Sequence, residues 1–127
     1  MNIEDSRVNY GNVITLGRAR YANIKKWKGY FISSNNIIIK NKDDIDFDYL
    51  YYLINKHKQK FYIEKTTYPV FSNETLKEFD CSIPADINEQ IKIANFLSLF
   101  EKKENLINMQ ITNLKKIKHF YLNNLFI

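Results

Sequence analysis

The stretch SIPADINEQIKIANFLSLFEKKENLINMQITNLKKIKHFYLNNLF, residues 82–126, decides the fold of this chain. After Pro84 it contains neither proline nor glycine, and its apolar residues recur at helical spacing. Asp86 or Asn88 can cap the first turn, because their side-chain oxygens accept hydrogen bonds from free backbone N–H groups. The sequence therefore predicts one helix of about ten turns, which is long for so small a chain.

The apolar residues of this helix change their pattern at Glu101. Before it they form a broad face that is typical of a helix packing on a globular core. Beyond it they narrow to a stripe that needs a second helix to cover it. We predict helix pairing through this stripe, and the alternative is a helix folded back on its own domain. The predicted pairing residues are Ile107, Ile111, Leu114, Ile117, Tyr121 and Leu125.

The residues before the helix predict a small β-rich domain. Alternation favours strands at 12–16, 30–33, 36–40 and 79–84, and an extended segment around Pro69. Helical spacing favours a helix over about 46–59, and a capping pattern favours one helical turn after Ser72. The predicted fold class is α+β, with a small mixed or antiparallel sheet in residues 1–86 and a long coiled-coil helix in residues 87–127.

The net charge of +5 is distributed unevenly along the chain. Residues 1–40 carry a net charge of +5, residues 41–86 a net charge of −3, and residues 87–127 a net charge of +3. A basic first third is typical of a surface that binds a polyanion, although a total of this size is also common in proteins without such a partner.

The most basic segment is GRARYANIKKWKG, residues 17–29, which contains no acidic residue. We predict a loop here. Arginine and lysine bind phosphate oxygens, while arginine and asparagine can also read base edges, and aromatic rings can stack on bases. The alternative is a solvated β-hairpin in which Trp27 covers the core. The candidate DNA-binding residues are Arg18, Arg20, Tyr21, Asn23, Lys25, Lys26, Trp27 and Lys28.

The sequence offers little for catalysis. It has no nucleotide-binding glycine motif, no metalloprotease motif and no nucleophile elbow, so we expect neither an enzyme nor a cofactor. The single cysteine, Cys81, excludes an intrachain disulfide and a zinc site built from several cysteines, and we expect no metal. No apolar run is long enough to span a bilayer and no signal peptide is evident, so we expect a cytoplasmic location.

The segment from Ile83 to Phe126 resembles the end of a target-recognition domain and the conserved helix that follows it in DNA-specificity (S) subunits of type I restriction-modification systems. The family pattern has Ile-Pro, then Glu-Gln and Ile-Ala, a long helix with Leu-x-x-x-Lys, and a terminal Leu-Phe. The residues that match it are Ile83, Pro84, Glu89, Gln90, Ile93, Ala94, Leu97, Leu114, Lys118, Leu122, Leu125 and Phe126.

The resemblance implies a module that recognises double-stranded DNA, with a helix that pairs antiparallel with a second module and docks methyltransferase (M) subunits. Restriction (R) subunits are further expected partners, and methylation and cleavage would reside in the partner subunits. Only about 85 residues precede the helix, fewer than the resemblance implies for a recognition domain, so we expect a truncated half-subunit, and the alternative is a compact relative. For a half-subunit we expect a homodimer that reads a palindromic, interrupted site.

Two other functions stay open from the sequence. The first is an interaction protein that assembles through its helix and modulates or blocks a restriction-modification complex without binding DNA. The second is a single-strand or RNA binder that uses Tyr21, Trp27 and Tyr30 for stacking.

Overall fold

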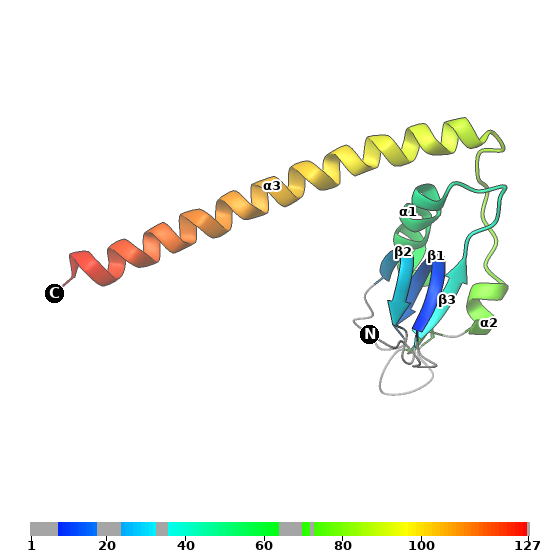
Figure 1. Cartoon of the computed structure of the whole chain (residues 1–127), viewed down its shortest axis with the longest axis horizontal. Coiled ribbons are helices and arrows are strands. Elements are labelled where there is room, and N and C mark those ends of the chain that lie inside the picture. The colour runs from blue at the N-terminus through cyan, green and yellow to red at the C-terminus, as the bar shows by residue number, and fades with distance from the viewer. Residues whose placement is uncertain (1–7, 18–23, 33–35, 64–69, 72, 127) are drawn as a thin grey trace. The chain divides into compact units, whose positions relative to one another are not determined.

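The computed structural model describes residues 8–17, 24–32, 36–63, 70–71 and 73–126. The chain divides into two compact units, Met1–Ile91 and Lys92–Ile127. The predicted α+β class is confirmed, with a small antiparallel sheet, short helices and a long C-terminal helix (Figure 1).

The sheet has three antiparallel strands in the order β2-β1-β3. They are β1 (Val8–Gly17), β2 (Ile24–Ile32) and β3 (Asn36–Lys40). The central strand β1 is buried on both faces over residues 13–16, which explains its unbroken run of Val-Ile-Thr-Leu. The predicted strands at 12–16 and 36–40 are therefore confirmed, and β1 is longer than predicted because it pairs on both sides.

The basic loop expected over residues 17–29 is wrong for Gly17, which ends β1, and for residues 24–29, while residues 18–23 lie outside the described residues. Residues 24–32 form β2, which pairs with β1 from Leu16 opposite Ile24 to Val8 opposite Ile32. Three of its first five residues are lysines, which local propensity disfavours in strands. An edge strand tolerates them, since lysine keeps such an edge from pairing with other chains.

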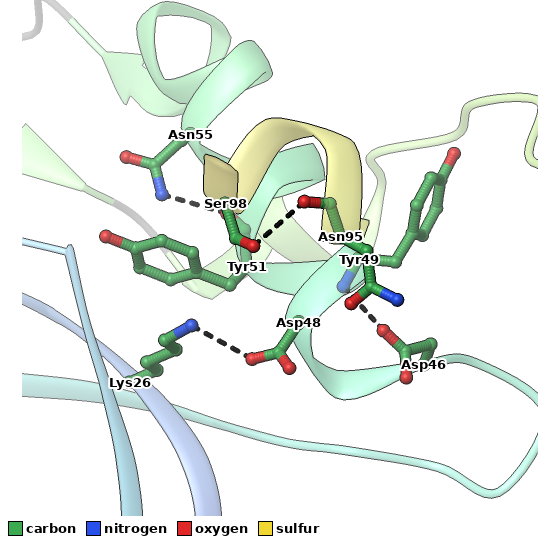
Figure 2. Close-up of polar contacts among 8 residues, drawn as sticks. All are labelled: Lys26, Asp46, Asp48, Tyr49, Tyr51, Asn55, Asn95 and Ser98. Carbon is green, nitrogen blue, oxygen red and sulfur yellow. Dashed lines mark hydrogen bonds and ion pairs between the residues drawn. The ribbon is translucent and has the colours of Figure 1, made fainter. Parts of the chain in front are cut away.

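Helix α1 (Phe47–His57) begins at the N-cap Asp46, whose Oδ2 accepts a 2.9 Å hydrogen bond from the backbone N–H of Tyr49 (Figure 2). The helix packs on one face of the sheet. The 3-10 helix η1 (Lys58–Phe61) follows, so the helix predicted over 46–59 ends two residues early. The hydrophobic core between sheet and helix contains Ile14, Leu16, Ile37, Phe47, Ile54 and Phe61.

Shorter elements complete the first unit. Strands β4 (Tyr62–Ile63) and β5 (Val70–Phe71) pair antiparallel, and the predicted helical turn is α2 (Asn73–Lys77). The strand predicted over 79–84 is wrong, because these residues have no regular structure. Their apolar character comes from side-chain packing instead: Phe79 packs on the core, with its ring centroid 4.9 Å from that of Phe61.

The predicted long helix is confirmed as α3 (Ile87–Leu125), which is 39 residues long. Asp86 caps it, since its Oδ1 accepts a 2.9 Å hydrogen bond from the backbone N–H of Asn88. Of the broad apolar face predicted before Glu101, Ala94 is buried and Ile93 is half-buried, whereas the rest is exposed: Ile91, Phe96, Leu97 and Phe100. No helix in the described part of the chain is long and apolar enough to cross a membrane.

Candidate nucleic-acid interface and helix surface

Half of the predicted DNA-binding residues lie on β2, and the other half lie outside the described residues. Lys25, Lys26, Trp27 and Lys28 occupy consecutive positions of the strand. Arg18, Arg20, Tyr21 and Asn23 belong to the segment that joins β1 to β2 and lies outside the described residues.

The lysines of β2 lie on opposite faces of the sheet, because successive side chains of a strand point to alternate faces. Lys25 lies on one face, and Lys26 and Lys28 lie on the other. Lys26 is opposite Ile14 in the register and therefore shares the face that packs on α1. Its Nζ forms a 2.9 Å ion pair with Asp48 Oδ1 and lies 4.9 Å from the centroid of the Tyr51 ring (Figure 2). The positive charge of Lys26 is thus partly compensated within the domain.

Lys28 lies on the same face as Lys26. Its Nζ is 5.9 Å from the centroid of the Phe47 ring, within the range of a cation–π contact. The side chain is nevertheless exposed, so its ammonium group stays accessible to solvent.

Trp27 is held in the sheet by a hydrogen bond. Its indole Nε1 donates to Thr15 Oγ1 at 2.9 Å, and it is opposite Val13 in the register. Thr15 and Val13 are both buried, and Trp27 is half-buried. This geometry agrees with the alternative in which Trp27 covers the sheet of a β-hairpin.

The sheet face opposite α1 brings together residues from all three strands. Thr15 is opposite Lys25 on one side and Ile38 on the other, while Val13 is opposite Trp27 and Lys40. Lys25 and Lys40 are exposed, and β1, β2 and β3 contain no acidic residue. Lys25 and Lys40 lie on the two outer strands of this face, which we call the basic face, and Val13 and Thr15 between them are buried. The face can attract a polyanion at its two exposed edges.

Lys40 was missed in the sequence analysis. It lies 15 residues after Lys25 in the chain, and the strand order places the two residues on opposite edges of the same face. No local pattern carries that information, because it depends on β3 pairing with β1 rather than with β2.

Among the described residues, His57 and Tyr49 have shifted pKa values. Burial against surrounding side chains, followed by the positive charges of Lys60 and Lys56, lowers the pKa of His57, whose ring lies 4.9 Å from that of Phe79. Burial raises the pKa of Tyr49, with smaller contributions from Cys81 and Glu89. Within the described residues, no group of three or more His, Cys, Asp or Glu side chains could hold a metal ion.

The first turn of α3 is attached to the N-terminal unit through Gln90, which is wholly buried. Its Oε1 accepts a 2.8 Å hydrogen bond from the backbone N–H of Asp46, and its Nε2 donates a 2.8 Å hydrogen bond to Pro84 O. Both ends of the side-chain amide are therefore satisfied. Gln90 belongs to the Glu-Gln motif, and its side chain links the first turn of α3 to Asp46 and Pro84.

The predicted helix-pairing residues all lie on α3, and each has between 44 and 71% of its surface exposed. A neighbouring stripe of exposed apolar side chains widens this surface. It consists of Leu99, Leu106, Met109 and Phe120. An apolar surface of this length on a single helix is the kind that a second helix covers.

A comparison with protein families identifies the family of this chain. The sequence matches a family model described as the type I restriction modification DNA specificity domain over residues 2–116. The matched range contains the sheet, α1, α2 and most of α3. Comparisons with curated proteins and with solved structures found no match.

Proposed function

Because the chain belongs to the type I restriction-modification DNA specificity family, we propose that its N-terminal unit recognises double-stranded DNA and that α3 joins it to a second module. The family consists of non-catalytic recognition domains. On this proposal, methylation and cleavage are performed by M and R subunits that assemble with the chain.

The observation that carries the DNA-binding proposal is the basic face. Lys25 and Lys40 are exposed there, and the three strands are free of carboxylates that would repel phosphate. We propose that these lysines contact the DNA backbone. Base readout is assigned to the β1–β2 connection, which carries Arg18, Arg20, Tyr21 and Asn23.

Titration of a fluorescent duplex of mixed sequence with the full chain, at salt concentrations between about 50 and 200 mM, tests this proposal. We expect binding that weakens steeply with salt and is abolished by the double substitution Arg18→Ala and Arg20→Ala. The matched control removes two positive charges from α3, with Lys102→Ala and Lys103→Ala. If duplex DNA does not bind even at the lowest salt, the recognition proposal fails. Competition with single-stranded DNA and with RNA separates duplex recognition from single-strand binding.

We further propose that two copies pair antiparallel through the exposed stripe of α3 and so form a two-fold symmetric reader of a palindromic, interrupted site. M subunits would dock on the remaining apolar surface of the paired helices. Solution mass measurement tests the pairing: Ile107→Lys plus Leu114→Lys should convert a dimer into a monomer. Asn105→Lys plus Thr112→Lys adds the same charge on another side of α3 and should leave the dimer intact.

A second candidate function is favoured by the contacts of Lys26 and Trp27. Asp48 partly compensates the charge of Lys26, and Thr15 binds the indole N–H of Trp27. Fewer of the β2 residues are then available to DNA than their sequence suggests. A chain that dimerises but does not bind duplex DNA would be an interaction protein that assembles through α3 and modulates a restriction-modification complex.

A further inference from the structure

An open groove of about 560 Å³ lies beside β3 within the N-terminal unit. Three consecutive strand residues, Ile37, Ile38 and Ile39, line one side of it. Leu53 of α1 and Leu76 of α2 contribute to the other walls. The groove is therefore mainly apolar, and it is large enough to hold several side chains.

The groove reaches the edge of β3. Ile37 and Ile39 share the sheet face that packs on α1, and Ile38, which points to the other face, also lines the groove. The inner edge of β3 pairs with β1, and no described strand pairs with its outer edge. Every second residue of that edge directs its backbone N–H and C=O groups outward, where they can bind another strand.

A strand edge that no described strand pairs with, beside an apolar groove, fits an extended polypeptide. Backbone hydrogen bonds to the edge would supply affinity, and alternate side chains would enter the groove and supply specificity. A small apolar molecule could fill the groove but would offer no backbone hydrogen bonds to β3.

The charge of the groove selects among extended polypeptides. Lys77 is the one charged residue among the described residues that line it, and an acidic side chain would complement it. The strand β3 of a second copy, NIIIK, has no acidic residue, so pairing of β3 with itself leaves Lys77 without this complement.

We propose that the groove along β3 binds an extended segment of a different protein, which adds a fourth strand to the sheet. The segment alternates apolar residues on the side that faces the groove and places an aspartate or glutamate beside Lys77. This interaction is separate from both DNA binding and helix pairing, and it gives the N-terminal unit a protein partner of its own.

Selection from a random heptapeptide display library on the full chain tests the proposal. We expect enriched peptides with alternating apolar residues and one acidic residue. Lys77→Glu should change the preferred charge to lysine or arginine, whereas Lys103→Glu on α3 is the matched control and should not. Absence of enrichment, or an unchanged charge preference with Lys77→Glu, would overturn the proposal.

A synthetic copy of an enriched peptide then tests strand addition directly. N-methylation of the backbone amides that face β3 should weaken binding at least tenfold, while methylation of the alternate amides should not. Hydrogen exchange of the β3 amides should slow when the peptide is bound. Equal effects of the two methylation patterns would overturn strand addition, as would occupancy by a small apolar dye that no peptide displaces.

Discussion

The side chain of Gln90 binds the backbone of Asp46, 44 residues earlier in the chain, through a hydrogen bond of 2.8 Å from the Asp46 N–H to Gln90 Oε1. Asp46 in turn caps α1 through its carboxylate. The start of α1 and the first turn of α3 are therefore held together by one connected set of hydrogen bonds.

Replacing Gln90 with leucine should destabilise the N-terminal unit by about 1–3 kcal/mol, because it leaves the partly buried Asp46 N–H and Pro84 C=O without the partners that Gln90 provides. Urea unfolding measures the change. Glu89→Leu, at the exposed neighbouring position, is the control and should change stability far less. Equal unfolding midpoints for the two variants would show that the Gln90 hydrogen bonds contribute little.

Replacing Asp46 with alanine should cost about 1 kcal/mol, since the N–H of Tyr49 loses its capping oxygen. Asp46→Asn should recover most of this loss, because the asparagine side chain keeps an acceptor. Asp44→Ala, in the exposed turn before the helix, provides the control. A stability of Asp46→Ala equal to that of Asp44→Ala would argue against the cap.

Lys25 and Lys26 should differ in their contribution to DNA binding although they are neighbours in sequence. Lys25 is exposed on the basic face, and Lys26 pairs with Asp48 on the other. Lys25→Met should therefore reduce the dependence of log affinity on log salt by about one unit, and Lys26→Met should change it much less. Identical slopes for the two variants would contradict the assignment of the basic face to DNA.

The titration of His57 should make stability depend on pH. Its pKa is lowered in the folded chain by burial and by Lys60 and Lys56, so the unfolded chain binds the proton more tightly. Stability should then fall as the pH drops below the ordinary histidine pKa of about 6.5. The difference in urea midpoint between about pH 7.5 and about pH 5.5 should be smaller in His57→Gln than in the parent chain. A difference as large as that of the parent chain would contradict a lowered pKa of His57 in the folded chain.

Helices were predictable from the sequence because their signals are local. The helical spacing over residues 46–59 located α1, although its cap at Asp46 was not predicted, and the absence of glycine and proline after Pro84 located α3. Strand β3 was predictable for a similar reason, since three consecutive β-branched residues are typical of a strand.

What the sequence could not reveal depends on pairing over long distances. Lys25, Lys26 and Lys28 read as a loop because nothing in that segment indicates that β1 pairs with it. Similarly, the apolar ring of Phe79 suggested a strand over residues 79–84, whereas in the structure this ring packs on the core from a segment that is not a strand. The hydrogen bonds of Gln90 depend on a contact between residues 46 and 90, which no local pattern encodes.

The exposed apolar surface of α3 also has a consequence for the amount of this protein in a cell. Side chains such as Leu114 and Leu125 are exposed in a single copy of the chain. Chaperones bind proteins that expose apolar surface, and proteases degrade them. Binding to a partner shifts the equilibrium toward the assembled form by mass action. The abundance of the chain should therefore follow the supply of whatever covers α3, so that synthesis in excess yields degradation rather than surplus protein.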